Sequence, residues 1–252
     1  MAGDCAPLTA GALEGVPHGF FTRDGGVSTG EVGGLQCGIG AKDDPLAVAE
    51  NRARATTAIA PGATLLTPHQ VHSPDVAIVR QAFAMRDRPH VDALVTAEEG
   101  LLLGIVTADC APVLLADHEH GVVGAAHAGW RGALHGVLAN TVEAMVALGA
   151  RRESIAAAVG PCIAQESYEV GEDMRGQFDA AAARFFAPGK PGHLQFDLAG
   201  YVAKALADAG VETVDVLGED TYGREDRFYS YRRATRRGEP TYGRQLSAIA
   251  VA

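Results

Sequence analysis

The sequence has little that would direct the chain into or across a membrane. No apolar run approaches the ~20 residues that span a bilayer, and the longest, around Leu101–Val106 and Ile155–Val159, have the length of strands. The first residues, MAGDCAPLTAGALEG, lack the basic segment and apolar core of a secretory signal. We therefore expect a cytoplasmic protein with no membrane partner.

Cysteine is also scarce, with four residues in a chain of 252. The four are far apart and form no Cys-x-x-Cys pair, which argues against a disulfide framework. Each is therefore either a small buried apolar side chain or a group with a chemical role. The cysteines are Cys5, Cys37, Cys110 and Cys162.

Positive charge is in short supply, because 21 lysines and arginines stand against 31 acidic residues and give a net charge of −10. Proteins that bind nucleic acid in general carry a basic surface, so we expect no nucleic-acid partner. A local arginine cluster can still attract a small anion against the overall charge. One such cluster is Arg232, Arg233, Arg236 and Arg237.

The remaining composition predicts one folded domain that spans residues 1–252. Hydrophobic residues make up 47% of the chain, which is enough for a large core, and no repeat or linker divides it. Because the predicted strands come in runs and the helices cluster later, we predict an α+β fold, a single layered domain with a mixed β-sheet and flanking helices.

The elements follow from aliphatic runs and helical periodicity. Asp44 and Pro45 are typical of a helix start, and they predict a helix through the segment LAVAENRARATTAIA. The other predicted helices are Gly132–Leu148, Met174–Phe186 and Leu198–Ala209. The predicted strands and closing segments are Gly19–Arg23, Thr64–His72, Val76–Val79, Ala93–Thr96, Leu101–Thr107, Pro112–Ala116, Val122–His127, Ile155–Val159, Thr213–Leu217, Phe228–Arg232 and Gln245–Val251.

Three short segments place reactive side chains at the ends of apolar strands: HQVHS at 69–73, TADCAP at 107–112 and AHAGWRG at 126–132. A catalytic zinc takes three imidazole, thiolate or carboxylate ligands and keeps one open position. His72, Cys110 and His127 would form such a set, although their separations of 38 and 17 residues match no compact zinc motif. Cys110 and His127 also fit a nucleophile–base pair, and each of the three also fits an ordinary buried side chain.

The segment Gly129–Gly132 opens a predicted helix. Backbone N–H groups at a helix start attract anions, and Arg131 adds a forked donor that suits phosphate, although ordinary turn chemistry explains the glycines equally well. Trp130, the one tryptophan, either packs in the core or stacks on a base. The zinc deaminase pattern H-x-E…P-C-x-x-C is incomplete, because the glutamate and the second cysteine are absent.

At these residues the chain resembles the YfiH-like family. The resemblance rests on QVHS, TADCAPVLLAD, AHAGWRG and GPCI…YEVG in this order, and it extends to both ends through FTRDGGVSTG, DDP…ENR and FYSYRR…GRQLSAI. Members of that family are described both as laccase-like polyphenol oxidases and as purine nucleoside phosphorylases. The fold resembles the catalytic domain of cytotoxic necrotizing factor, which uses a Cys–His pair.

The resemblance implies a zinc site formed by His72, Cys110 and His127, beside a pocket for nucleoside and phosphate to which Arg52 contributes. It implies phosphorolysis of adenosine, inosine, guanosine and methylthioadenosine, and deamination of adenosine. Other descriptions of the family imply copper-dependent oxidation or hydrolysis in the editing of cell-wall precursors.

Two positions depart from the family pattern. Members often have Asn in an LN-x-G segment where this chain has Gln36, whose longer side chain changes any substrate contact made there. They also often have Cys before a Thr-Tyr pair where this chain has Asp220, so no thiolate can act at that position. The three implied zinc ligands are all retained.

Our first hypothesis is a zinc-dependent purine nucleoside enzyme whose partners are a nucleoside and phosphate. Arg52 and Arg131 would place the phosphate and Trp130 is the candidate for contact with the base, while Zn²⁺ would orient the substrate or activate water for deamination. Asp109, next to the ligand cysteine, is either an acid–base group or a turn residue.

Three alternatives stay open. One is a cysteine hydrolase with Cys110 as nucleophile and His127 as base. Another is a polyphenol oxidase with Cu²⁺ at the same His₂Cys set, and the last is a binding protein without catalysis. We expect a monomer or a small homo-oligomer. Cys162 is expected to be structural and His69 to lie at a rim, with Tyr168 and Glu169 as candidates for shaping the pocket.

Overall fold

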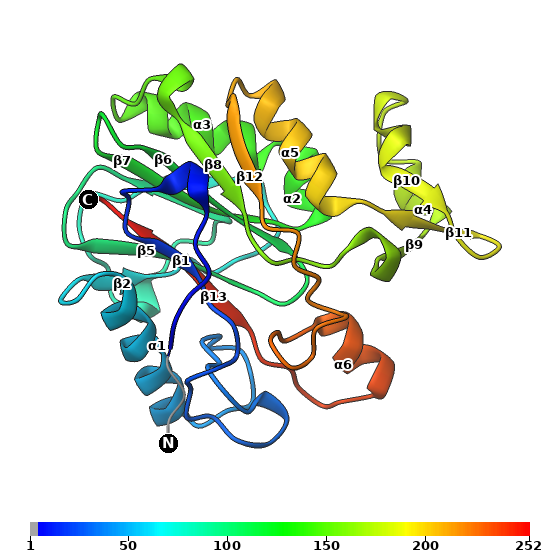
Figure 1. The fold of residues 1–252 in the computed structure, drawn as a ribbon, viewed down its shortest axis with the longest axis horizontal. Helices are drawn as coiled ribbons and strands as arrows, with labels where there is room; N and C mark the ends of the chain where they lie inside the picture. Colours follow the sequence, from blue (N-terminus) through cyan, green and yellow to red (C-terminus); the bar gives the residue numbers. More distant parts are fainter. Residues whose placement is uncertain (1–4) are drawn as a thin grey trace.

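The computed structural model describes residues 5–252, and residues 1–4 of the predicted domain lie outside that range. Two mixed sheets stack face to face, with helices on both outer surfaces (Figure 1). The predicted α+β class is confirmed, and the sheet is in fact two large sheets and a small one. Among the described residues, none of the helices combines the length and apolar character needed to cross a membrane.

The larger sheet has six strands in the order β12-β8-β6-β7-β4-β3. Its outer pairs β12–β8 and β3–β4 are parallel, and the three pairs between them are antiparallel. The strands are β3 (Val76–Ile78), β4 (Ala93–Thr96), β6 (Ala111–Asp117), β7 (Val122–Ala128), β8 (Ala156–Val159) and β12 (Thr213–Val216).

The second sheet has four strands in the order β1-β13-β5-β2. The last strand of the chain, β13, therefore lies between the first strand and the middle strand β5, where its register pairs Gln245 with Thr107. The strands are β1 (His18–Phe20), β2 (Thr64–Leu66), β5 (Leu101–Thr107) and β13 (Gln245–Ala250).

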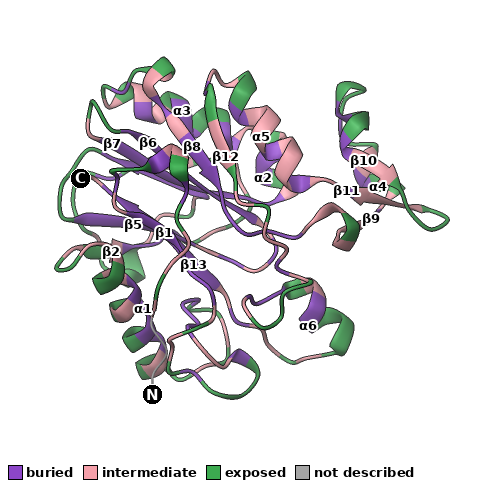
Figure 2. Ribbon diagram, in the orientation of Figure 1, coloured by how far each residue is buried: buried purple, intermediate pink, exposed green. Residues whose placement is uncertain are grey.

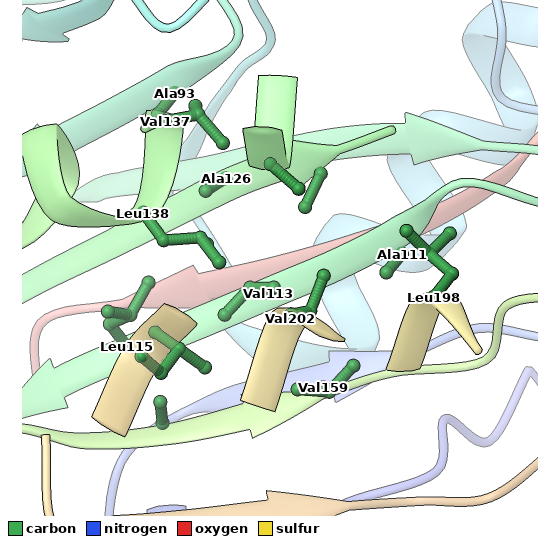
Figure 3. Packing of buried hydrophobic residues seen from close by; sticks show 14 of the residues in the cluster. Ala93, Ala111, Val113, Leu115, Ala126, Val137, Leu138, Val159, Leu198 and Val202 are labelled. Atoms are coloured by element: carbon green, nitrogen blue, oxygen red, sulfur yellow. The ribbon is translucent and has the colours of Figure 1, made fainter. Parts of the chain in front are cut away.

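Strand β6 shows how the layers form. Val113 and Leu115 pack on the helix side of the sheet, whereas Leu114 packs in the cluster between the two sheets. Both faces of the strand are covered, so a continuous apolar run replaces the alternation of a half-exposed strand. Figure 2 shows the resulting buried band through the central strands, and Figure 3 shows Val113 in one cluster with Leu138 and Val202 of the covering helices.

Helix α1 (Pro45–Ile59) lies against the four-stranded sheet, and α3 (Val137–Ala147) and α5 (Leu198–Asp208) lie against the six-stranded sheet (Figure 1). The predicted start of α1 is confirmed, because the Asp44 side chain accepts a hydrogen bond from the Leu46 amide and Pro45 is the first helical residue. The predicted helix Gly132–Leu148 is wrong as one piece. It consists of α2 (Trp130–His135) and α3, separated by Gly136, whose φ is 95°.

Two other predicted elements are wrong in extent. The strand predicted over Thr64–His72 ends at Leu66, and the following residues form a loop up to β3. The helix predicted over Met174–Phe186 is replaced by the short α4 (Glu172–Arg175), a 3₁₀ turn at Ala181–Phe185 and strand β10 (Phe186–Pro188). Apolar spacing at Met174, Phe178 and Phe185 looks helical, but the three residues lie in α4, in the bend after it and in the 3₁₀ turn. Their side chains still join one buried cluster.

The sequence pattern did not reveal the small sheet β10-β11-β9, which adds β9 (Glu169–Gly171) and β11 (His193–Phe196). It also missed helix α6 (Tyr231–Arg237), which begins inside the predicted closing segment Phe228–Arg232. Ser230 caps α6 by accepting a hydrogen bond from the Arg233 amide. The small sheet and α6 border the ends of β6 and β7 at which the reactive segments lie (Figure 1).

Candidate metal centre and cavity

The structure brings His72, Cys110 and His127 together at one end of the six-stranded sheet. One potential ligand atom from each lies within 4.8 Å of the other two. Within residues 5–252, this is the one group of three or more His, Cys, Asp or Glu side chains arranged in this way. His127 is buried, Cys110 is half-buried and His72 is exposed, so the group is open to solvent on one side.

Each residue reaches the centre from a different element. Cys110 immediately precedes β6, and His127 is the second-last residue of β7. Since β6 and β7 are antiparallel, with Ala111 opposite Ala128, the start of one strand meets the end of the other. His72 comes from the loop after β2 in a left-handed backbone conformation, with φ of 61°, which is uncommon for a residue with a side chain.

Gly129 leaves room for the centre. A Cβ atom at this position would lie 2.8 Å from His72 Nδ1 and 3.1 Å from Cys110 Sγ. Its φ of −72° is open to any residue. The glycine is therefore required for space at the ligand cluster and not for backbone freedom.

Asp92, which the sequence analysis did not single out, connects two of the three ligands. Its Oδ1 lies 2.7 Å from His127 Nδ1. Its Oδ2 accepts hydrogen bonds from the backbone amides of Val71 and Ser73, on either side of His72, at 3.0 and 2.7 Å. A carboxylate that holds the second nitrogen of a ligand histidine is a usual support of metal centres, and it leaves Nε2 of His127 to face Cys110.

The electrostatics of the group follow from these contacts. Burial alone would lower the pKa of His127, but the adjacent Cys110 thiol and the hydrogen bond to Asp92 outweigh it and raise the pKa to about 9. Burial alone would raise the pKa of Asp92, but hydrogen bonds from His127 and the Ser73 and Val71 amides lower it to about 2. Burial and the neighbouring His127 lower the pKa of His72, which favours the neutral imidazole that binds metals.

A cavity of about 740 Å³ opens beside this group. Its walls include all three candidate ligands together with Asp109, Trp130, Arg131, His69 and Tyr168 from the sequence analysis. Four arginines line it, namely Arg88, Arg131, Arg232 and Arg244. Although the chain carries a net charge of −10, the cavity walls are rich in positive charge.

Asp109 lies in the turn between β5 and β6 with φ of 85°. Its Oδ1 accepts a hydrogen bond from Thr221 Oγ1 at 2.7 Å, and its Oδ2 accepts from Ser230 Oγ and the Arg232 amide at 3.0 and 2.6 Å. Burial raises the pKa of this carboxyl. Asp109 thus ties the turn that carries Cys110 to the start of α6.

Arg131 stacks over the Trp130 ring at 5.0 Å, and both side chains face the cavity. Arg52, in contrast, is not among the residues that line it. The Arg52 guanidinium is buried and donates to the Cys37 carbonyl and to Thr67 Oγ1, at 3.1 and 3.0 Å. It joins α1 to the segments that continue into the cavity wall at Gly38 and Pro68.

The two positions that depart from the family pattern lie behind the cavity walls. Gln36 is fully buried and accepts a hydrogen bond from the Gly38 amide, and its Nε2 donates to Asp43 Oδ2. Asp220 accepts hydrogen bonds from the Ala164 and Tyr222 amides, among others, and closes a turn. Neither residue lines the cavity in the described structure.

The other residues named from the sequence also differ in whether they line the cavity. Cys162 is buried outside the cavity lining, and burial raises the pKa of its thiol. Glu169 forms an ion pair with Lys190. Of the predicted arginine cluster, only Arg232 lines the cavity; Arg233 donates to backbone carbonyls and Arg237 forms ion pairs with Glu225 and Glu239.

The comparisons with known proteins cover nearly the whole chain. The sequence model described as multi-copper polyphenol oxidoreductase laccase matches residues 17–252. The purine nucleoside phosphorylase of Deinococcus radiodurans is 48% identical over 228 residues, which are 90% of this chain and 87% of that protein. The purine nucleoside phosphorylase ORF3 of Streptomyces griseus is 43% identical over 90% of this chain and 92% of that protein.

Solved structures have the same fold. Protein NMB0706 of Neisseria meningitidis superposes with a TM-score of 0.87 at 33% identity, over 98% of this chain and 99% of that one. YlmD from Geobacillus stearothermophilus superposes with a TM-score of 0.83 at 28% identity, over 96% of this chain and 94% of that one.

Proposed function

The chain belongs to the multi-copper polyphenol oxidoreductase laccase family, and we propose that it is a purine nucleoside phosphorylase with a zinc centre at His72, Cys110 and His127. The observation that carries the proposal is the position of this His–Cys–His group in the wall of a cavity lined by four arginines. Phosphorolysis needs a bound phosphate, and guanidinium groups bind phosphate through paired hydrogen bonds.

The donor set fits zinc. Two imidazoles and one thiolate are ligands that zinc prefers, and three protein ligands leave the fourth position of a tetrahedral site open. When bound, the ion supplies a Lewis acid at that open position. Asp92 fixes the ring of His127, and Gly129 keeps the space between His72 and Cys110 free of side-chain atoms.

Side chains of the cavity bind the phosphate and the nucleoside. Arg131 and Arg232 hold the phosphate, and Trp130 and Tyr168 offer aromatic faces to the nucleoside in the same cavity. An oxygen of dihydrogen phosphate attacks the sugar carbon C1′, and the bond from C1′ to the base nitrogen breaks with its electron pair passing to the base. The departing base takes the proton that the attacking phosphate releases. The predicted acid–base role of Asp109 requires that one of its internal hydrogen bonds opens during the reaction.

The proposed substrates are purine nucleosides. We include adenosine, inosine, guanosine and methylthioadenosine as nucleosides, and deamination of adenosine at the same centre. Deamination needs an activated water near the purine ring, and a zinc ion held by His72, Cys110 and His127 would supply it.

A second candidate is a cysteine hydrolase. The 2.7 Å contact between Asp92 and His127, with the thiol of Cys110 on the other side of the imidazole, has the order of an orienting acid, a base and a nucleophile. A thiolate bound to a metal is not free to attack, so this function and the zinc proposal exclude each other. Copper at the same group is a third candidate, but one group of three ligands among residues 5–252 does not hold several copper ions.

The test is the rate of hypoxanthine release from inosine as a function of phosphate concentration. Cys110→Ala and His127→Ala should each lose at least about 100-fold, the usual cost of removing a catalytic group. Cys162→Ala is the matched control, because this cysteine is buried outside the cavity, and it should keep the wild-type rate.

The same assay separates the candidates after the metal is removed by chelation. The proposal predicts that activity disappears and that added zinc restores it. Full activity without metal, lost in Cys110→Ala and in His127→Ala, would overturn the zinc proposal in favour of the hydrolase. Copper bound in place of zinc in the purified protein, with no base released, would favour the oxidase.

A further inference from the structure

The four arginines of the cavity have no carboxylate partners. Within the described part of the chain, ion pairs involve Arg54, Arg86, Arg152, Arg224, Arg227, Arg233 and Arg237, and none of these lines the cavity. Asp109 is the one acidic residue in the lining, and its two oxygens accept hydrogen bonds from Thr221, Ser230 and the Arg232 amide. The positive charge of the cavity is therefore left for a ligand.

Two of the arginines adjoin the candidate metal centre. Arg131 is the second residue after Gly129, whose Cα borders His72 and Cys110. Arg232 lies over the Tyr168 ring at 5.5 Å, and its backbone amide donates to Asp109, the neighbour of Cys110. Arg232 Nη1 already donates to the Glu169 carbonyl at 2.9 Å, which fixes the guanidinium and leaves its other N–H groups for a ligand. Together with the guanidinium of Arg131, these donors suffice for one phosphate beside the centre.

The other two arginines belong to a different wall, formed by Gly38–Gly40 and Pro68. Arg244 packs against this wall, because a Cβ on Gly38 would lie 2.9 Å from its Cδ and a Cβ on Gly40 would lie 3.7 Å from its Nη1. The Arg244 guanidinium also stacks over Tyr242 at 4.4 Å. Its position is thus fixed by packing on one side and by an aromatic ring on the other.

Arg88 lines the cavity from the loop before β4. It is close enough to Arg52 for the two charges to repel, and Arg52 bonds to Cys37 and Thr67, the neighbours of Gly38 and Pro68. Arg88 Nε donates to the Met85 carbonyl at 3.0 Å, which fixes the stem of the side chain. The next residues hold the cavity rim in place: the His69 amide donates to the Pro89 carbonyl at 2.9 Å, and the rings of His69 and His90 stack at 4.3 Å. Two pre-positioned guanidinium groups without carboxylates are a device for binding an anion.

We propose that Arg88 and Arg244 form a second anion subsite, which binds the phosphate ester of a phosphorylated purine nucleoside. The inference deepens the proposed function, on which it rests, by adding a substrate class: a nucleoside 5′-monophosphate beside the uncharged nucleosides. The inorganic phosphate occupies Arg131 and Arg232, and the ester phosphate occupies Arg88 and Arg244. A cavity of about 740 Å³ is in the upper part of the range of small-molecule sites, roughly 300–1,000 Å³.

The test is calorimetric binding of inosine and of inosine 5′-monophosphate to the metal-loaded protein without inorganic phosphate. We expect the monophosphate to bind at least about 10-fold more tightly, in line with two charge-assisted contacts. Arg88→Gln and Arg244→Gln should each remove most of this advantage and leave inosine binding unchanged. Arg86→Gln is the matched control, because Arg86 is two residues from Arg88 but its side chain is 88% exposed.

Equal binding of the two ligands would overturn the inference. So would an advantage that disappears in Arg131→Gln but persists in Arg88→Gln and Arg244→Gln, since the ester would then occupy the subsite of the inorganic phosphate. The release of hypoxanthine on addition of phosphate tests the proposed phosphorylase function separately. If the binding advantage depends on Arg88 and Arg244 but neither ligand releases hypoxanthine when phosphate is added, the subsite stands and the phosphorylase proposal fails.

Discussion

At the scale of single residues, the sequence predicted the candidate ligands and missed the residue that supports them. His72, Cys110 and His127 could be named because each lies at the end of an apolar segment, and because the segments QVHS, TADC and AHAGWRG that carry them resemble those of the YfiH-like family. Asp92 had no such signal, since an aspartate before a short strand looks like an ordinary turn residue. Its contact with His127 spans 35 residues of chain, and only the pairing of β4 with β7 creates it.

The support by Asp92 is testable by Asp92→Asn. An amide cannot accept from both His127 and the two loop amides in the way that a carboxylate does, so the ring and the His72 loop should lose their fixed positions. We expect a 10- to 100-fold loss of metal affinity and of kcat/KM, the usual effect of removing such a partner. Zinc titration and inosine turnover measure it.

Asp75→Asn is the control for this prediction, since Asp75 is exposed in the same loop. It should match the wild type in both measurements. An Asp92→Asn protein with unchanged zinc affinity would show that Asp92 only stabilises the loop.

The raised pKa of His127 predicts a pH dependence of the metal-free protein. The folded value of about 9 exceeds the ordinary 6.5, so the protonated ring stabilises the fold. That stability is fully present below about pH 6.5 and is lost as the pH rises through about 9. We expect the free energy of unfolding to fall by on the order of 2–3 kcal/mol over this interval, as measured by urea titration.

His127→Gln should remove this slope, because the glutamine amide does not titrate. A wild-type profile that stays flat between pH 6.5 and 9, or a variant with the same slope, would contradict the assignment.

At the scale of elements, regular strands were predictable and the loops around the cavity were not. Strands β4 to β7 agree with the aliphatic runs to within a residue or two, because burial on both faces leaves a clear signal in the sequence. The loop after β2 was predicted as a continuation of the aliphatic strand segment that begins at Thr64, yet the amides of Val71 and Ser73 bond to Asp92 instead of a neighbouring strand. Whether such a segment forms a strand or a loop depends on a residue distant in sequence, which the periodicity of the segment itself does not identify.

Gly129 and Gly136, on either side of α2, are required for different reasons, so their alanine variants should behave differently. Gly129→Ala places a Cβ between His72 and Cys110 at an ordinary backbone conformation, so the metal-free fold should keep its stability while zinc content and turnover are lost. Gly136→Ala adds a Cβ in open space but at φ of 95°. It should cost about 1 kcal/mol of stability and keep the metal.

Metal analysis and urea denaturation of both variants distinguish the two effects. If Gly129→Ala retains stoichiometric zinc and full activity, the centre does not lie where the three ligand atoms converge.

At the scale of the whole molecule, the sequence predicted the class of fold but not the order of its strands. A mixed sheet with flanking helices follows from the succession of apolar segments, but the division into two stacked sheets depends on β13 pairing between β1 and β5. The contact joins the end of the chain to its beginning, and hydrophobicity alone does not specify which strand is the partner. The stacked sheets bury the cluster that includes Leu114.

The layer between the sheets should dominate stability. Leu114 is fully buried there, so Leu114→Ala should reduce the free energy of unfolding by about 2–5 kcal/mol through lost burial and a residual cavity. Leu46→Ala removes the same atoms from a side chain that is 78% exposed and should change stability by less than about 0.5 kcal/mol. Similar losses in both variants, measured by urea denaturation, would show that the two sheets do not form the central layer.

The central claim is that inorganic phosphate enters the reaction as a substrate at the cavity beside His72, Cys110 and His127. Phosphorus NMR of inosine incubated with the zinc-loaded protein and phosphate tests it most directly. The account predicts that ribose 1-phosphate appears in step with hypoxanthine and that inorganic phosphate disappears in equal amount. Hypoxanthine with free ribose and unconsumed phosphate, or no release of the base at all, would contradict it.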